Sequence, residues 1–326
     1  MIRFLYVVSV LFVATAAYSK EIIYIDHTGA NGAPFQLALH HTKGSGVPVL
    51  YIHGSSFPIA LSSEWGFSDG TSWADDLAKS GFDAWGLDFV GYGHSTRPDY
   101  TSVPDSFGRS DHAAQQIMTA VNFISDLREG ARVSIIAHSW GTVAAGRFAS
   151  LYPENVGRLV LFGPIVPRLN KSAAQESQML PYKLVTPAQQ RTRFLSEVPD
   201  FHAPVLEEPD LAEWGQAYLA SDPTSRNREP FAVQVPSGPI KDAIETWSGR
   251  WLFEPSKITV PTLIIRGEWD TASTDLDVQH LYKKLGAKEK PIMTIPKATH
   301  LMHLEKARAL LWRESRIFLS RTSLAR

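Results

Sequence analysis

One serine in this sequence lies where a nucleophile would be built. Ser139 is the centre of the pentapeptide Ala137-His138-Ser139-Trp140-Gly141, which follows the β-branched run 133–136 and precedes a helix-like stretch. A tight turn between a buried strand and a helix raises a serine hydroxyl above the edge of a sheet. It also leaves backbone N–H groups at the helix start facing the same space. Small residues at positions 137 and 141 let strand and helix pass closely. The pattern predicts a nucleophilic serine rather than a surface serine in a turn.

An activated serine needs a base, and the choice among the eleven histidines depends on placement. His300 follows the strand expected over 291–295, in a loop before the last expected helix. His303 is the alternative, but it would lie within or beside the start of that helix, where a polar residue commonly has a structural role. We therefore predict that His300 is the base.

A carboxylate must orient that histidine, and the loop after the expected strand 262–266 supplies one. Asp270 stands at the carboxyl end of this strand, where it can fix the histidine tautomer and stabilise its charged form. Glu268 lies in the same loop and is the alternative, and a helix N-cap is the structural role that Asp270 would otherwise have. We predict Asp270 as the orienting acid.

Backbone N–H groups would bind the developing oxyanion. His53-Gly54-Ser55-Ser56 follows the expected strand 47–52, and its glycine lets the chain turn sharply. The N–H groups of Ser55 and Trp140 are the best pair. We expect His53 to be structural, and His138 and Trp140 side chains to pack or to line the pocket.

The elements that must position these residues alternate along the chain. Strands are expected over 21–27, 35–41, 47–52, 82–88, 132–137, 158–162, 262–266 and 291–295, and helices over 72–79, 111–127, 142–151, 274–285 and 306–320. Such alternation predicts the α/β class, with a mostly parallel central sheet flanked by helices on both faces.

Between residues 164 and 255 the alternation stops, prolines become frequent and short helices are suggested. We interpret 164–255 as a helical cap insertion in a core formed by 20–163 and 256–326. Apolar residues recur at helical spacing in 239–252. The aromatic residues of this segment are candidates for an apolar pocket, above all Trp214, Trp247 and Trp251, although such residues commonly only hold a cap to its core.

The N-terminus resembles a secretory signal. Arg3 precedes the apolar run 4–13, which is short for a membrane span, and small residues follow, so we expect a signal peptide over 1–19. An uncleaved membrane anchor is the alternative.

The sequence contains no cysteine, which excludes disulfides, thiol nucleophiles and thiolate metal sites. These features predict a secreted or periplasmic protein without stable membrane insertion after cleavage.

Taken together, the motifs resemble those of the α/β-hydrolase fold superfamily across essentially the whole mature region. The matching pieces are His53-Gly54, the segment 88–95, the turn at Ser139, the loop 267–270 and the segment 300–305. The order serine, aspartate, histidine is that of the superfamily's triad. Ala137 departs from the usual glycine, as does Ala298-Thr299 before the histidine. The resemblance implies serine-type hydrolysis without a cofactor or a metal.

The sequence therefore predicts an exported serine hydrolase of the esterase–lipase type, acting on a hydrophobic small-molecule ester. Amide or peptide hydrolysis and C–C bond cleavage on the same triad are alternatives, and a non-catalytic binding protein is a third. Ser139-Trp140-Gly141 is similar to prolyl aminopeptidases, but the run after His53 lacks their Gly-Gly-Pro. A peptidase would need a cap carboxylate for the substrate amine, with Glu207, Glu208, Asp210 and Glu213 as candidates. The formal net charge of −1 gives no case for a nucleic-acid partner, and the oligomeric state stays open.

Overall fold

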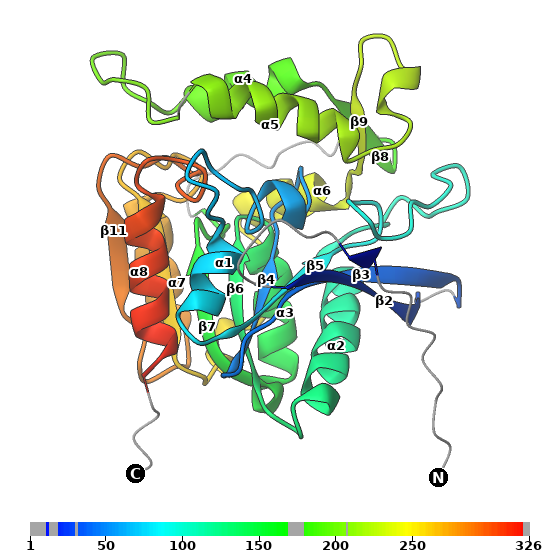
Figure 1. The fold of residues 1–326 in the computed structure, drawn as a ribbon. Coiled ribbons are helices and arrows are strands. Elements are labelled where there is room, and N and C mark those ends of the chain that lie inside the picture. Colours follow the sequence, from blue (N-terminus) through cyan, green and yellow to red (C-terminus); the bar gives the residue numbers. More distant parts are fainter. Residues whose placement is uncertain (1–10, 13–18, 30–31, 169–178, 207, 322–326) are drawn as a thin grey trace.

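A single mixed sheet forms the centre of the protein (Figure 1). The computed structural model describes residues 11–12, 19–29, 32–168, 179–206 and 208–321. The strands, in sheet order, are β1 (Leu11–Phe12), β2 (Lys20–Thr28), β3 (Pro34–Thr42), β5 (Asp83–Asp88), β4 (Pro48–Ile52), β6 (Val133–His138), β7 (Val156–Phe162), β10 (Thr262–Gly267) and β11 (Ile292–Ile295). From β5 to β11 the neighbours are parallel, whereas β1, β2 and β3 add to one edge antiparallel.

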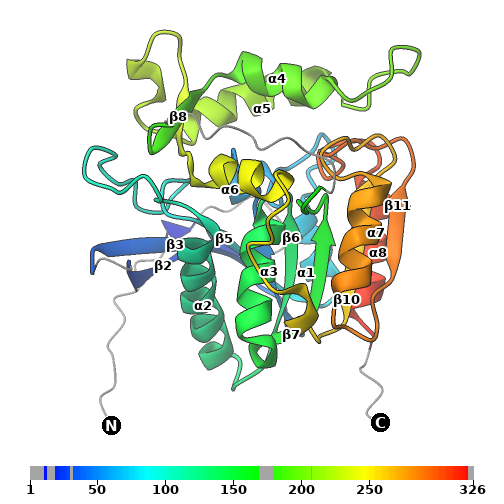
Figure 2. The same cartoon turned by 180° about the vertical axis from the view of Figure 1, so that it is seen from behind.

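Helices cover both faces of this sheet. Those of the core are α1 (Trp73–Lys79), α2 (Ser110–Leu127), α3 (Gly141–Leu151), α7 (Asp275–Lys284) and α8 (Arg308–Leu319), with short 3-10 turns η1 (Ile59–Leu61), η2 (Pro153–Asn155) and η4 (Pro255–Lys257). Helices α1 and α8 pack on one face, and α2, α3 and α7 on the other (Figures 1 and 2). Strands β4, β5 and β6 are buried along their whole length, because parallel strands covered on both sides need apolar residues on both sides. The predicted α/β class is confirmed.

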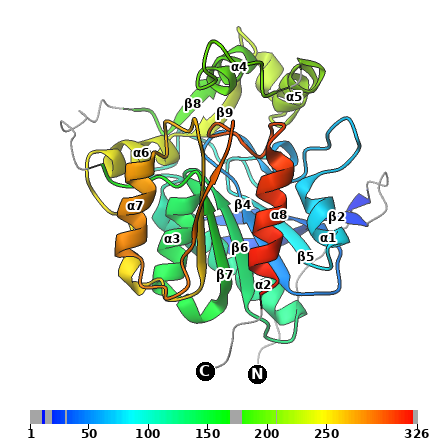
Figure 3. The same ribbon diagram turned by 90° about the vertical axis from the view of Figure 1, so that its left-hand side faces the viewer.

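Most of the described chain between β7 and β10 forms a separate layer over the carboxyl ends of the parallel strands (Figures 1 and 3). It contains β8 (Tyr182–Val185), α4 (Pro187–Leu195), α5 (Glu208–Ala220), η3 (Ser225–Asn227), β9 (Val233–Pro236) and α6 (Gly238–Trp247). Helix α4 begins at a capping box, in which the Thr186 hydroxyl accepts from Gln189 N at 3.1 Å and Gln189 Oε1 accepts from Thr186 N at 2.8 Å.

Two sequence expectations for this layer were wrong in detail. It is not purely helical, because β8 and β9 pair antiparallel with Tyr182 opposite Pro236. Each strand has only four residues, and their pairing joins distant parts of the chain, so neither leaves a strong local pattern. Helix α6 also ends at Trp247, and Gly249 follows with a φ of 109°, which leaves Trp251 beyond the helix.

The predicted signal segment 1–19 lies largely outside the described residues, which include only Leu11, Phe12 and Ser19 of it. Within the ranges that the structure describes, no helix has the length and apolar character needed to cross a bilayer.

A buried ionic cluster joins β3 and β5 at the edge where β5 ends. The His40 ring contacts Glu64 Oε2 through Nδ1 at 2.6 Å and Asp88 Oδ2 through Nε2 at 2.9 Å. Burial alone would lower the pKa of His40, but the two carboxylates raise it well above its ordinary value. Burial opposes ionisation of Asp88 as well, yet His40 and the N–H of Ile59 hold the pKa of Asp88 below its ordinary value. His40 is therefore an imidazolium between two carboxylates.

We expect Asp88→Ala to lower the free energy of unfolding by about 3–5 kcal/mol, because it leaves a buried charge without one partner. The folded-state pKa of Asp88 lies below 3.8 and that of His40 above 6.5, so the pair is fully formed between these values. Its contribution is lost as pH falls through the folded pKa of Asp88 and as pH rises through that of His40. Urea unfolding of both proteins across this range measures the difference.

Glu64→Gln is the control for that experiment. Glu64 is partly exposed while Asp88 is fully buried, and glutamine keeps an acceptor for Nδ1. A loss in Glu64→Gln equal to that in Asp88→Ala would contradict the assignment of the main stabilisation to the buried Asp88–His40 contact.

Candidate active site

Ser139 occupies the turn between β6 and α3 in a strained backbone conformation. Its φ is 54°, a region that non-glycine residues rarely adopt, at a cost of about 1–3 kcal/mol. The N–H of Ser139 donates to Phe162 O of β7 at 3.1 Å, which holds the turn against the sheet. A Cβ on Gly141 would lie 2.5 Å from His53 O, so the start of α3 has no room for a larger residue. The predicted sequence of strand, tight turn and helix is confirmed.

The structure brings His300 to this serine and Asp270 to the histidine. His300 follows β11, and its Nε2 lies 2.7 Å from Ser139 Oγ. Its Nδ1 lies 3.0 Å from both carboxylate oxygens of Asp270, which follows β10. With Nδ1–H donating to the carboxylate, Nε2 is free to accept the serine proton. All three residues follow the carboxyl ends of parallel strands in the same half of the sheet, and all are buried.

The glycine after β7 makes room for this arrangement. Gly163 has a φ of 56°, and a Cβ there would lie 2.9 Å from His300 Cε1 and 3.3 Å from Asp270 Oδ2. The N–H of Ser273 donates to Asp270 Oδ1 at 2.8 Å and fixes the carboxylate. The acid and the base are thus held in one geometry by the surrounding backbone.

The alternative base and acid lie elsewhere. His303 is buried, and neither ring nitrogen has a hydrogen-bond partner among the described residues. Burial, with the charges of His300 and Arg193, lowers the pKa of His303 to about 3, so this ring is neutral. Glu268 accepts a hydrogen bond from Lys297 N at 2.8 Å in an exposed loop. Neither residue is in contact with Ser139 or His300 through a hydrogen bond.

Ser139 and His300 open into a cavity of about 270 Å³. Ser55 and Trp140, whose N–H groups are the predicted oxyanion donors, line this cavity beside Ser139. The other lining residues come from the layer above and from the loops around it: Ile165, Lys183, Arg193, Ser196, Glu197, Ile240, Ala243, Trp247, Thr271, Ala272 and Leu301. The cavity thus combines Ser139 and His300 with both apolar and charged lining residues.

The two histidines that flank these residues in sequence have structural partners. His53 Nδ1 contacts Gly54 O at 2.7 Å, and its Nε2 accepts from Phe89 N at 3.3 Å. His138 Nε2–H donates to His300 O at 3.0 Å, which supports the loop that carries His300. Burial lowers the pKa of both His53 and His138, so both rings are neutral.

Of the three predicted pocket tryptophans, only Trp247 lines the cavity. Trp214 is buried instead, stacks on Tyr218 with ring centroids 5.2 Å apart, and donates through Nε1 to Leu61 O at 3.0 Å. Trp251 packs edge-on against Phe253 at 5.4 Å. Trp214 and Trp251 therefore do not line this cavity: Trp214 is held in the packing between the upper layer and η1, and Trp251 lies beyond the end of α6.

Glu197, at the end of α4, is a functional candidate that the sequence did not reveal. Its Oε2 accepts from His300 N at 2.7 Å, and its Oε1 accepts from Thr271 N at 2.9 Å and from Thr271 Oγ1 at 2.5 Å. These hydrogen bonds, against the effect of burial, lower the pKa of Glu197. One carboxylate of the upper layer therefore fastens the loops of both the acid and the base. No motif surrounds Glu197, so only the folded chain identifies it.

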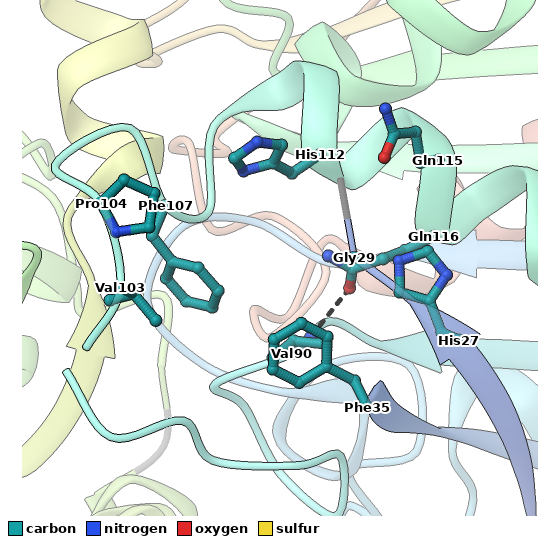
Figure 4. Close-up of a pocket in the computed structure, with 10 residues that line it drawn as sticks. All are labelled: His27, Gly29, Phe35, Val90, Val103, Pro104, Phe107, His112, Gln115 and Gln116. Carbon is teal, nitrogen blue, oxygen red and sulfur yellow. Dashed lines mark hydrogen bonds between the residues drawn. The ribbon is translucent and has the colours of Figure 1, made fainter. Parts of the chain in front are cut away.

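A second cavity, of about 260 Å³, lies away from these residues (Figure 4). Phe35, Val103 and Phe107 give it apolar walls, and the polar groups of His27, His112, Gln115 and Gln116 lie around them. Gln116 Oε1 accepts a hydrogen bond from Val90 N at 2.9 Å. Its described lining contains neither a serine nor a carboxylate, so the nucleophilic chemistry belongs to the cavity at Ser139.

Solved structures of several hydrolases share this fold. A thermophilic esterase from Thermogutta terrifontis is 18% identical, with a TM-score of 0.58 over 91% of this chain and 97% of that one. A serine hydrolase involved in carbazole degradation is 17% identical, with a TM-score of 0.57 over 91% and 99%. An epoxide hydrolase from Vigna radiata is 17% identical, with a TM-score of 0.57 over 92% and 99%. At such identities the likeness shows the fold alone.

A family match covers most of the chain. Residues 70–307 match the hydrolase family described as serine aminopeptidase, S33. The matched range includes Ser139, Asp270 and His300 as well as the layer above the sheet. Together with the shared fold, this match shows that the chain belongs to the serine aminopeptidase S33 family of α/β-hydrolases.

Proposed function

We propose that this protein is a serine hydrolase that cleaves carboxylic esters. The observation that carries the proposal is the hydrogen-bonded chain from Ser139 Oγ through His300 to Asp270, at the floor of a cavity. Ser139 is the nucleophile, His300 the general base and Asp270 the group that orients it. The N–H groups of Ser55 and Trp140 bind the oxyanion.

The geometry supports a two-step reaction through an acyl-enzyme. His300 Nε2 takes the proton of Ser139 Oγ as this oxygen attacks the ester carbonyl, and then gives it to the leaving alcohol. Water, deprotonated by the same nitrogen, releases the acid. Proton transfer of this kind contributes about 10²–10⁴-fold to the rate. Each oxyanion donor contributes about 10²–10³-fold.

Amide hydrolysis at the same serine is the second candidate, and the family description favours it. An aminopeptidase needs a free carboxylate for the substrate's amino group. Glu213 is exposed on α5, and neither Asp210 nor Glu213 is among the described lining residues of the cavity. Glu207 and the side chain of Glu208 lie outside what the structure describes. The cavity therefore favours the ester.

The segment 164–255 is, in this proposal, a cap that encloses the substrate over Ser139, and Lys183, Arg193 and Trp247 of this segment line the cavity.

We also propose that the protein is exported and loses residues 1–19. Intact-mass measurement of the protein recovered from the periplasm or medium of an expressing bacterium tests this export and the removal of residues 1–19. Retention of residues 1–19 would contradict it.

Hydrolysis of p-nitrophenyl esters of increasing acyl length, beside amino-acid p-nitroanilides, tests the proposed reaction. We expect turnover of short esters, weak turnover of the anilides, and none of either by Ser139→Ala. The chain length with the highest kcat/KM measures the depth of the cavity. Efficient cleavage of the anilides with poor cleavage of all esters would contradict the esterase proposal and support the aminopeptidase hypothesis.

A further inference from the structure

The cavity at Ser139 carries an unbalanced positive charge. Lys183 of β8 and Arg193 of α4 both line it. Glu197 is the one carboxylate among the described lining residues. Because Glu197 already accepts three hydrogen bonds, from His300 and Thr271, it is committed to holding those loops.

Lys183 has no partner for its ammonium group. No hydrogen bond or ion pair joins this group to any part of the chain that the structure describes, although the residue is largely shielded from solvent. Burial, with the positive charge of Arg193, lowers the pKa of Lys183 to about 8. The ammonium is thus held in a place that disfavours its charge, and an anion beside it would remove that cost.

Arg193 is paired only with neutral groups. Its Nη1 donates to Ser56 Oγ at 2.7 Å and to Gln190 Oε1 at 3.5 Å, and no carboxylate of the described residues lies within 4.0 Å of it. Burial lowers the pKa of Arg193, and the negative charges of Glu197 and Asp270 act on it in the opposite sense. Its hydrogen bond to Ser56 places the guanidinium next to Ser55, the proposed oxyanion residue.

Two other basic residues of the same layer each have a carboxylate partner. Arg228 lies 2.8 Å from Asp222 Oδ2, and Arg250 lies 2.5 Å from Glu245 Oε1. Even the exposed Arg250 has a carboxylate, whereas the two cations in the cavity have none within the described residues. A pair of like charges left without a counter-ion in a concave site favours a bound anion.

We propose that the substrate of Ser139 carries a carboxylate, which Lys183 and Arg193 hold in this cavity. The hydrocarbon part of the substrate then lies against Ile240, Ala243 and Trp247 of α6. This inference rests on the proposed ester hydrolysis. The volume of about 270 Å³ is at the small end for ligand sites, so the fitting class is a half-ester of a short dicarboxylic acid.

Two esters that differ in one charge test the proposal. p-Nitrophenyl hydrogen glutarate has a carboxylate where p-nitrophenyl pentanoate has a methyl group. We expect the wild-type protein to have a kcat/KM about 10- to 100-fold higher for the glutarate, mainly through a lower KM, because hydrogen bonds to charged groups are worth that factor. Lys183→Met should remove most of this ratio, and Lys183→Arg should restore it.

Lys257→Met is the matched control. It removes the same charge from an exposed position on η4, outside the cavity, and should leave the ratio between the two esters unchanged. A wild-type protein that prefers the pentanoate, or a ratio that Lys183→Met does not alter, would overturn the proposal while the ester hydrolase stands.

Calorimetric titration with glutarate separates the two proposals when neither ester is cleaved. In that case the ester hydrolase fails, and the anion site is judged by binding alone. Glutarate should bind the wild-type protein about 10-fold or more tightly than it binds Lys183→Met. Equal affinity, or no binding by either protein, would overturn the anion site.

Discussion

Replacing Ser139 by alanine should lower kcat for ester hydrolysis by about 10⁶-fold, because the variant keeps the cavity and the oxyanion donors but has no nucleophile. The measurement is the release of p-nitrophenol under saturating ester, with the folded state of the variant checked by circular dichroism. An organophosphonate should add its mass to the wild-type protein at Ser139 and leave the variant unlabelled.

Ser55→Ala is the control for this experiment. The proposed contribution of Ser55 is its backbone N–H, which alanine retains, so kcat should stay within a few-fold of the wild-type value. A loss in Ser55→Ala as large as that in Ser139→Ala would show that the wrong hydroxyl has been named as the nucleophile.

Asp270→Asn should lower kcat by about 10⁴-fold. Both carboxylate oxygens of Asp270 lie 3.0 Å from His300 Nδ1, so an amide there removes the charge that stabilises the imidazolium and allows the wrong tautomer. The loss should appear in kcat rather than in KM, because Asp270 does not line the cavity. Steady-state kinetics on one ester separates the two.

The comparison variant is Glu268→Gln, in the same loop. Glu268 contacts the backbone of Lys297 rather than His300, so its replacement should leave kcat near the wild-type value. Near-normal activity of Asp270→Asn together with a large loss in Glu268→Gln would transfer the role of acid to Glu268.

The sheet and the positions of Ser139, Asp270 and His300 could be predicted because each depends on a short stretch of chain. A buried parallel strand is a continuous apolar run, and the residue that follows it necessarily stands at the edge where the neighbouring strands also end. Ser139 follows β6, Asp270 follows β10 and His300 follows β11 in this way. The strand pattern of the sequence is therefore enough to predict that Ser139, Asp270 and His300 lie close together in the folded protein.

The rest of the site depends on contacts between distant segments. Glu197 reaches His300 and Thr271 only because α4 lies over the sheet, and nothing near Glu197 in sequence indicates this. Lys183 lies in β8, whose pairing with β9 across the intervening helices was not predicted. Packing between distant segments decides which residues of the upper layer face the substrate. In the sequence, a charged residue that faces the substrate looks the same as one on the protein surface.

The sheet order has a consequence for how the enzyme becomes active. Strand β10 lies beside β7, although all of residues 163–261 separate them, and β11 adds outside β10. The serine strand therefore completes its own neighbourhood early in the chain, whereas the acid and the base arrive only with the final segment. A chain in which the last strands have not yet docked lacks both Asp270 and His300 beside Ser139, so we expect ester hydrolysis to begin only when β10 and β11 are in place.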